Sequence, residues 1–526
     1  MLRSYNVLFT ITIVVLALCS LVQTLPRCAE NDDECHDRRM HPDLPNVVTS
    51  KLRSMRTEEE NNINFWRNQG KEFIKQKLNA QPNTKRAKNI IMFLGDGMGL
   101  TTLAAARNII GGESQSLSFE KFPYVGLSKT YSVDKIVPDS ACTATAYLCG
   151  VKAMEGTIGV NGMVDRENCN TMKDSANHVF SIAKWAMDAG KSAGLVTTTR
   201  VTHASPAGVY AHIAERDWEN DSEVNDACGV NSGVRDIADQ LINGEVGSKL
   251  KLIMGGGKSQ FIDAKLYERG YRRDGRNLID EFKQKSSKNL YLETREQLMS
   301  ANLSSAERVL GIYQNSHLLY HLETNETTNQ PTLEEMTRKA IEYMSSNDKG
   351  YFIFIEGGRI DLAHHDNMAR IALDETAEFS KAVQTARELT SEDDTLIVVT
   401  ADHSHSFSFA GYPQRGNNIF GKAPAQADDK IPYLTLSYAN GPSYEKYYDT
   451  KHNKRRDPTS VLTGEAHDMF PSTFALKDET HGGEDVPVFA SGPWSHLFTG
   501  VYEQNTIPHI MGYASCLGAG LKSCDS

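Results

Sequence analysis

Residues 89–95, Asn-Ile-Ile-Met-Phe-Leu-Gly, begin a series of short apolar runs that decides the fold. The other runs cover residues 192–197, 250–255, 351–356, 395–400 and 486–490. Helical segments between them include residues 181–189, 333–344 and 374–388. Each run ends in glycine or polar residues and has no polar face, as is typical of strands that are covered on both sides. The alternation predicts an α/β fold, with a mostly parallel β-sheet sandwiched between helices.

The predicted core is one large domain that covers residues 58–410 and 479–526, and it begins with an amphipathic helix over residues 58–78. Between its two parts, residues 411–478 are rich in Gly, Pro, Asn, Lys and Asp. Only residues 431–436 within this segment resemble a strand. We therefore interpret it as a subdomain inserted between two core strands.

The N-terminus predicts export. Arg3 precedes an apolar run over residues 7–18, which is short for a membrane span. We expect a cleaved signal peptide over residues 1–24, with an uncleaved anchor as the alternative, and a polar extension over residues 25–57. The sequence ends at Ser526 without the hydrophobic tail of a glycolipid-anchor signal. We predict a secreted protein with no evident membrane anchor.

Cysteines and glycosylation sequons agree with secretion. Cys28 with Cys35, and Cys516 with Cys524, are close enough to close small disulfide loops, and Cys169 with Cys228 is the expected long-range pair. We expect Cys142 and Cys149 to be buried free thiols. Sequons that predict a glycoprotein begin at Asn220, Asn302 and Asn325.

The overall charge argues against one class of partner. The 526 residues carry a net charge of −11, and no stripe of lysine and arginine interrupts the acidic balance. Proteins that bind nucleic acid through the phosphate backbone present basic surfaces. We therefore expect no nucleic-acid partner.

A serine at a predicted helix start is a candidate nucleophile. In residues 137–150, Val-Pro-Asp-Ser-Ala-Cys-Thr-Ala-Thr-Ala-Tyr-Leu-Cys-Gly, a helix is expected over residues 141–148. Ser140 then faces free backbone N–H groups, which favour a bound phosphate or a developing oxyanion. A serine at this place can also simply cap the helix, so the stretch alone leaves both interpretations open.

Acids and histidines follow the ends of the predicted strands. Asp361 and His365 are spaced i, i+4 and would share one helical face, a workable pair of zinc ligands. Asp402 and His403 directly follow an apolar strand, where both are costly to desolvate unless something binds them. His481 precedes two glycines near the last strand. The alternative for each is an ordinary surface or capping residue.

Oxygen ligands and one arginine complete the candidates. Asp96 lies between glycines after the first strand, Glu356 ends another strand, and Ser205 shares one side of an extended segment with His203. Such oxygen atoms suit Mg²⁺, whereas imidazole suits Zn²⁺. Arg216 is a candidate fork for two phosphate oxygens.

Six motifs together carry a family resemblance. They are Asp96-Gly-Met-Gly, Pro138-Asp-Ser-Ala, His203-Ala-Ser-Pro-Ala-Gly, Glu356-Gly-Gly-Arg-Ile-Asp, Ala401-Asp-His-Ser-His and Thr480-His-Gly-Gly-Glu-Asp. In order and spacing they resemble the motifs of the animal alkaline phosphatases, over roughly residues 50–524. The resemblance implies a phosphomonoesterase that works at alkaline pH through a phosphoserine on Ser140.

The resemblance also implies two zinc ions, one magnesium ion and a homodimer. The ligand sets would be Asp361, His365 and His481 for one zinc; Asp96, Asp402, His403 and Ser140 for the other; and Asp96, Ser205 and Glu356 for magnesium, with His203 close by. Asp139 would steady Arg216, and His405 would support the zinc pair. Tyr412 would reach into the partner's site, and residues 411–478 match the insertion called the crown.

The sequence departs from the vertebrate members at a few positions. Gln314 and Gln330 replace acids of an extra calcium site, so calcium is not expected, and Leu362 replaces a polar residue near the metals. A related phosphodiesterase, sulfatase or phosphopentomutase would instead show a cysteine or threonine nucleophile, or four histidine ligands. A catalytically silent extracellular binding protein on the same scaffold is the alternative from another class. It would be expected to lack Ser140, Arg216 or a ligand.

Overall fold

The computed structural model describes residues 58–325 and 327–525. The predicted signal peptide, the N-terminal extension and the Cys28–Cys35 pair lie outside these residues. In the described part of the chain, no helix is both long and apolar enough to cross a membrane.

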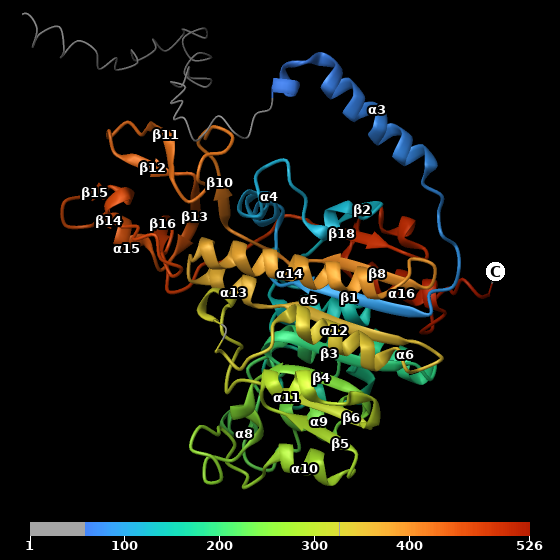
Figure 1. The fold of residues 1–526 in the computed structure, drawn as a ribbon. Helices are drawn as coiled ribbons and strands as arrows, with labels where there is room; N and C mark the ends of the chain where they lie inside the picture. Colours follow the sequence, from blue (N-terminus) through green and yellow to red (C-terminus); the bar gives the residue numbers. More distant parts are fainter. Residues whose placement is uncertain (1–57, 326, 526) are drawn as a thin grey trace, which may run out of the picture. The chain divides into compact units, whose positions relative to one another are not determined.

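A ten-stranded sheet forms the centre of the fold (Figure 1), in the order β19-β2-β18-β8-β1-β7-β3-β4-β6-β5. Its strands are β1 (Asn89–Gly95), β2 (Tyr124–Lys129), β3 (Ser192–Arg200), β4 (Leu252–Gly256), β5 (Asn289–Leu292), β6 (Arg308–Ile312), β7 (Tyr351–Gly357), β8 (Thr395–Thr400), β18 (Val486–Ser491) and β19 (Gly500–Glu503). Only β18 runs antiparallel to its neighbours, β8 and β2. The prediction of a mostly parallel α/β sheet is confirmed.

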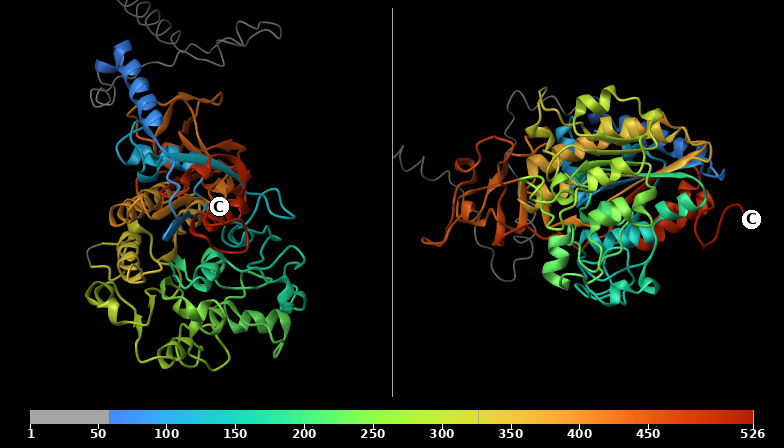
Figure 2. Two further views of the ribbon diagram at one scale, coloured as in Figure 1. Left: turned by 90° about the vertical axis from the view of Figure 1, so that its right-hand side faces the viewer. Right: turned by 90° about the horizontal axis from the view of Figure 1, so that it is seen from below.

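Both faces of the sheet are buried, because side chains of a strand alternate between two layers. On β1, Ile90 and Met92 pack in one apolar core with residues of α6 (Ile182–Asp188) and α16 (Ile507–Ser515). Ile91 and Phe93 pack in a second core with residues of α4 (Leu100–Ile109), α12 (Leu333–Met344) and α14 (Ala369–Leu389). The two helical layers are visible in the right-hand view of Figure 2.

The other helices vary in length, and several carry candidate residues. They are α3 (Ile63–Asn79), α5 (Ser140–Ala144), α7 (Ala204–Ala207), α8 (Asp221–Cys228), α9 (Ile237–Asn243), α10 (Leu278–Gln284), α11 (Arg295–Ser300), α13 (Arg359–His365) and α15 (Tyr444–Tyr447). Among them, α5 and α13 lead into the candidate site.

The inserted segment folds into small sheets of its own, apart from the ten strands (Figure 1). Its strands and those beside it are β9 (Ser404–His405), β10 (Phe407–Phe409), β11 (Lys422–Gln426), β12 (Pro432–Leu434), β13 (Leu436–Gly441), β14 (Tyr448–Asp449), β15 (Lys454–Arg455), β16 (Ser472–Ala475) and β17 (His481–Gly482). Residues 431–436, the stretch expected to be a strand, contribute to β12 and β13. The domain boundaries at residues 410 and 479 stay a prediction.

Helix α3 differs from the other long helices because it has no buried residue. Its apolar side chains Ile63, Phe73, Ile74 and Leu78 are each more than half exposed. The amphipathic pattern therefore forms a helix, but no described element of this chain covers its apolar face.

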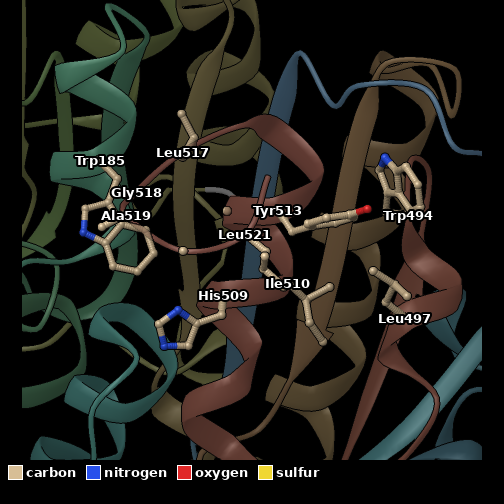
Figure 3. Close-up of a pocket in the computed structure, with 12 residues that line it drawn as sticks. Trp185, Trp494, Leu497, His509, Ile510, Tyr513, Leu517, Gly518, Ala519 and Leu521 are labelled. Atoms are coloured by element: carbon tan, nitrogen blue, oxygen red, sulfur yellow. The ribbon is translucent and has the colours of Figure 1, made fainter. Parts of the chain in front are cut away.

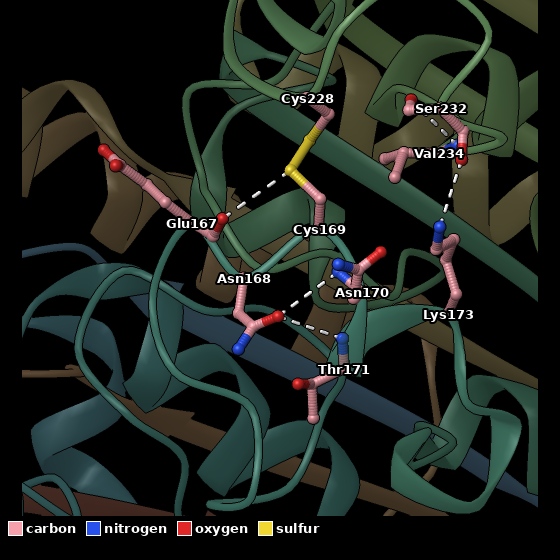
Figure 4. The surroundings of a disulfide bond; sticks show 9 residues. All are labelled: Glu167, Asn168, Cys169, Asn170, Thr171, Lys173, Cys228, Ser232 and Val234. Atoms are coloured by element: carbon pink, nitrogen blue, oxygen red, sulfur yellow. Dashed lines mark hydrogen bonds between the residues drawn. A yellow bond between two sulfur atoms is a disulfide. The ribbon is translucent and has the colours of Figure 1, made fainter.

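Two of the expected disulfides lie in the described residues, and both are bonded. Cys169 joins Cys228 (Figure 4), and Cys516 joins Cys524. Cys142 and Cys149 are free and buried, as expected from their place beside Ser140.

The sequon at Asn220 requires a correction. Its side chain is fully buried, caps α8 and donates from Nδ2 to Gln260 Oε1 at 2.7 Å. The nitrogen that would carry a glycan is therefore engaged inside the fold, and the expectation of glycosylation there is wrong. Asn302 and Asn325 are exposed.

Candidate active site and metal centre

The candidate site lies at the carboxyl ends of three adjacent parallel strands. Asp96 follows β1, Glu356 is near the end of β7 and Asp402 follows β8, with β1 paired between β7 and β8. Parallel strands bring such ends to one edge of a sheet. All three carboxylates are fully buried.

Ser140 is the first residue of α5, and its hydroxyl points into this edge. Its Oγ lies 3.2 Å from His403 Nε2 and 3.4 Å from Asp96 Oδ1. Asp139 is the N-cap and accepts a hydrogen bond from Cys142 N. Asp139, and not Ser140, therefore caps the helix. The serine hydroxyl faces Asp96 and His403 instead.

Asp361, His365 and His481 form the first ligand cluster. Asp361 and His365 lie one helical turn apart on α13. His365 Nδ1 donates to the Glu479 carbonyl, and His481 Nδ1 donates to the Pro138 carbonyl. In the neutral form of each ring, Nε2 therefore carries the lone pair. The two Nε2 atoms lie 3.1 Å apart, and 3.3 and 3.5 Å from Asp361 Oδ1.

Two imidazole lone pairs and a carboxylate that face one small space are a donor set for zinc. Two neutral rings so placed would repel each other without a cation between them. The residues present therefore fit the metal that the motifs imply.

His403 belongs to the second cluster. Its Nε2 lies 3.2 Å from Asp402 Oδ2 and 3.6 Å from Asp96 Oδ1, while its Nδ1 lies 3.2 Å from the Ser404 carbonyl. The other Asp402 oxygen accepts from Gly97 N at 3.0 Å, which fixes the carboxylate. Ligand atoms of Asp96, Asp361 and His403 lie within 4.8 Å of one another, so the two clusters are neighbours.

The third cluster contains only oxygen. Ser205 Oγ donates to Asp96 Oδ2 at 3.3 Å, and the hydroxyls of Thr197 and Thr199 donate to Glu356 Oε2. Glu356 Oε1 is buried and has no hydrogen-bond partner. An orphaned carboxylate oxygen among oxygen donors fits a magnesium ion.

The electrostatics of the site favour bound cations. Burial, together with the neighbouring carboxylates, raises the pKa of Asp96 and Asp402, and burial raises the pKa of Glu356 to about 7. Burial acts in the same direction on Asp361, but the facing histidines hold the pKa of that carboxyl well below its usual value. Burying several ionised carboxylates together costs free energy unless cations bind beside them.

Arg216 pairs with Asp139, the residue before Ser140. Its guanidinium donates to Asp139 Oδ2 at 2.9 Å and lies 3.3 Å from His203 Nε2. Burial opposes ionisation of Asp139, but Arg216 and backbone N–H groups, one of them from Gly156, lower its pKa below the usual value. The ion pair therefore holds the Arg216 guanidinium in a fixed orientation beside Ser140.

Glu479 has a role that the sequence did not suggest. Its carboxylate accepts from His405 Nδ1 and from Ser406 N, and its backbone N donates to the His365 carbonyl. His405 in turn donates from Nε2 to Asp361 Oδ1 at 2.8 Å. Glu479 thus orients two members of the first cluster. Its position two residues before His481 was the feature of the sequence that could have identified it as part of the site.

Thr197 and Thr199 were also missed. Their spacing of two on β3 places both hydroxyls on one face, toward Glu356. His364, between Asp361 and His365 on α13, contacts Thr102 Oγ1 and the Tyr438 hydroxyl instead.

The remaining predicted residues lie outside the three clusters. Tyr412 is 65% exposed in the insertion. Gln314 Nε2 donates to Gln330 Oε1 at 3.2 Å, so the two side chains that replace acids bind each other. Leu362 is half-buried on α13.

An apolar cavity of about 620 Å³ lies elsewhere, beside α16 (Figure 3). Trp185, Trp494 and Tyr513 line it, with the chain around Leu517. No carboxylate and none of the candidate catalytic residues line this cavity, so it does not compete with the strand-end site for the chemistry.

Comparison with known proteins points to one family. The sequence model described as alkaline phosphatase matches residues 87–517. The chain is 43% identical to the membrane-bound alkaline phosphatase of Bombyx mori, over 94% of this chain and 92% of that protein. It is 44% identical to the tissue-nonspecific alkaline phosphatase of Homo sapiens, over 91% and 93% of the two chains.

Solved structures agree on the fold. The alkaline phosphatase of Thermus thermophilus superposes with a TM-score of 0.59 at 22% identity, covering 85% of this chain and 95% of that one. The enzyme of the Antarctic bacterium TAB5 gives 0.56 at 23% identity, covering 83% of this chain and all of its own. At this identity the likeness concerns the fold alone.

Proposed function

Because the chain belongs to the alkaline phosphatase family, we propose that this phosphomonoesterase acts at alkaline pH through a phosphoserine intermediate on Ser140. The observation that supports it best is the position of the serine hydroxyl, between His403 Nε2 and Asp96 Oδ1. A hydroxyl that only capped a helix would have no reason to face a buried carboxylate and an unprotonated imidazole nitrogen.

The three clusters would hold two zinc ions and one magnesium ion per chain. Zinc would bind Asp361, His365 and His481 at one place, and Asp96, Asp402, His403 and Ser140 at the other, with magnesium at Asp96, Ser205 and Glu356. When bound, these cations would lower the pKa of the serine hydroxyl and stabilise negative charge on the leaving oxygen. Calcium is not part of the proposal, since Gln314 and Gln330 bind each other.

The protein's own residues would act as follows. Ser140 Oγ attacks phosphorus, the ester oxygen leaves, and water later cleaves the phosphoserine, which releases phosphate and restores the hydroxyl. Arg216 donates two N–H groups to phosphoryl oxygens, and Asp139 fixes its orientation. His203 lies against the same guanidinium. His405, held by Glu479, orients Asp361.

The experiment is turnover of p-nitrophenyl phosphate at about pH 9, with and without a chelator, joined to metal analysis of the purified protein. Loss of turnover on chelation and its return with zinc and magnesium are expected, with two zinc and one magnesium per chain. Turnover that is indifferent to chelation would contradict the metal assignment. No turnover in the fully metallated protein would favour a silent binding scaffold.

We also propose that the protein is a secreted homodimer with glycans at Asn302 and Asn325. The uncovered apolar face of α3 and the exposed Tyr412 support the dimer, because large apolar side chains gathered on one surface mark an interface.

The double variant Phe73→Glu, Ile74→Glu should therefore be monomeric in light scattering. The control Gln69→Glu, Gln76→Glu adds the same charge to exposed polar positions of α3 and should stay dimeric. A monomeric wild-type protein would refute the proposal.

A further inference from the structure

The amino edge of the sheet carries a pocket that the phosphatase chemistry does not use. Lys88 directly precedes β1, Lys191 directly precedes β3, and Lys349 comes two residues before β7. Together with Arg86 and Asp348 they line a pocket of about 400 Å³. Since β1 has seven residues, this pocket lies about 20 Å from the carboxyl edge.

Lys191 forms the floor of the pocket and is only 6% exposed. Its Nζ donates to the carbonyl oxygens of Lys88 at 2.7 Å and Lys349 at 2.9 Å. An ammonium group has three N–H donors, so one remains for a ligand. Burial, together with the charges of Arg86 and Lys88, lowers the pKa of Lys191 to about 8.

The four cations of the pocket outnumber its one acid, Asp348. In the described residues, none of them has a carboxylate oxygen within 4.0 Å, although the chain has 67 acidic and 56 basic side chains. Buried Arg272 pairs with Asp236, whereas buried Arg308 donates to two carbonyl oxygens. A buried ammonium surrounded by like charge is costly unless an anion accompanies it.

We propose that this pocket binds a tetrahedral oxyanion, a sulfate or phosphate group, either free or attached to a sulfated glycan. A strongly hydrated ammonium acts as a point charge for such groups, and exposed Lys88, Lys349 and Arg86 can close around one held by Lys191. The inference does not depend on the proposed catalytic cycle, because no ligand cluster contributes to the pocket.

The test is calorimetric titration of the metallated protein with sodium sulfate and, separately, with a heparin hexasaccharide. The exposed pair is changed in Lys88→Gln, Lys349→Gln. The control Lys451→Gln, Lys477→Gln removes the same charge from exposed positions of the insertion. Sulfate that binds the catalytic centre contributes equally to both variants, so their difference reports the pocket.

Affinity is expected to fall about tenfold or more in Lys88→Gln, Lys349→Gln and to stay near the wild-type value in the control. Loss of sulfate binding indicates a free ion as the ligand, and loss of hexasaccharide binding alone indicates a glycan; both support the pocket. Equal affinities in the two double variants overturn it. Lys191→Met removes the buried ammonium group. It should abolish the oxyanion binding that Lys88→Gln, Lys349→Gln only weakens.

Discussion

The two edges of the central sheet carry opposite charge. At the carboxyl edge, Asp96, Glu356 and Asp402 are fully buried together, and histidines face them. At the amino edge, Lys191 is buried beneath other cations and no acid pairs with it. Strands β1 and β7 thus begin beside a lysine and end beside a buried acid.

The difference between the edges lies in how each charge is supported. The carboxyl edge has a dense set of orienting contacts: Thr197 and Thr199 on Glu356, Gly97 on Asp402, and Glu479 through His405 on Asp361. The amino edge has only two carbonyl contacts to one ammonium. Preorganised ligands suit chemistry, whereas a lightly held cation suits simple binding.

The largest effect is expected at the reacting hydroxyl. Ser140→Ala should leave less than about a thousandth of the turnover of p-nitrophenyl phosphate, because the nucleophile is lost. Zinc and magnesium contents should change little, since the imidazoles and carboxylates remain. A variant that is still fast would show that Ser140 is not the nucleophile.

The control for this variant is Ser181→Ala, another buried serine, whose hydroxyl donates to the Val209 carbonyl. It should keep its turnover, so that a loss in Ser140→Ala is specific to the site.

A smaller effect is expected at Glu479, which tests whether the orienting contacts matter. Glu479→Gln weakens the hold on His405 and should reduce zinc affinity by about 10- to 100-fold, as is usual for partners of metal ligands. The measurement is zinc retained after dialysis against a graded chelator, so the result does not depend on activity. Glu484→Gln, exposed on the same segment, is the control. Equal retention in both variants would mean that Glu479 serves the fold alone.

The sheet and the ligands could be predicted from the sequence because both leave local patterns. Strands buried on both faces read as unbroken apolar runs, as residues 90–94 of β1 and 396–399 of β8 do. Strand β2 gave no such pattern, since Val125 on it is 51% exposed. Strand β6 begins with Arg308, whose charge is satisfied by carbonyl groups of residues 247 and 250.

The features that could not be predicted from the sequence depend on contacts between segments far apart in the chain. Asn220 has the pattern of a glycosylation site, yet Gln260, forty residues later, buries and binds it. Glu479 acts through His405, which lies 74 residues earlier. Neither relation leaves a trace in local periodicity, because the two partners come together only in the folded chain.

The smallest effect is expected at a buried acid that belongs to none of the three ligand clusters. Glu375 on α14 accepts from His321 N at 2.6 Å, and burial raises its pKa to about 7. The folded protein then keeps a proton on Glu375 that the unfolded chain has already lost above about pH 4.5. Stability should therefore fall as pH rises from about 5 to 7, by at most about 1.4 kcal/mol per pH unit.

Glu375→Gln cannot release that proton, so its stability should vary less over the same range than that of the wild type. The measurement is the urea midpoint at several pH values, with exposed Glu388→Gln on the same helix as the control. Parallel profiles for Glu375→Gln and the control would mean that Glu375 stays ionised inside the fold. Burial alone would then not neutralise an acid here, and the raised pKa values at the carboxyl edge would be poor evidence that its acids need cations.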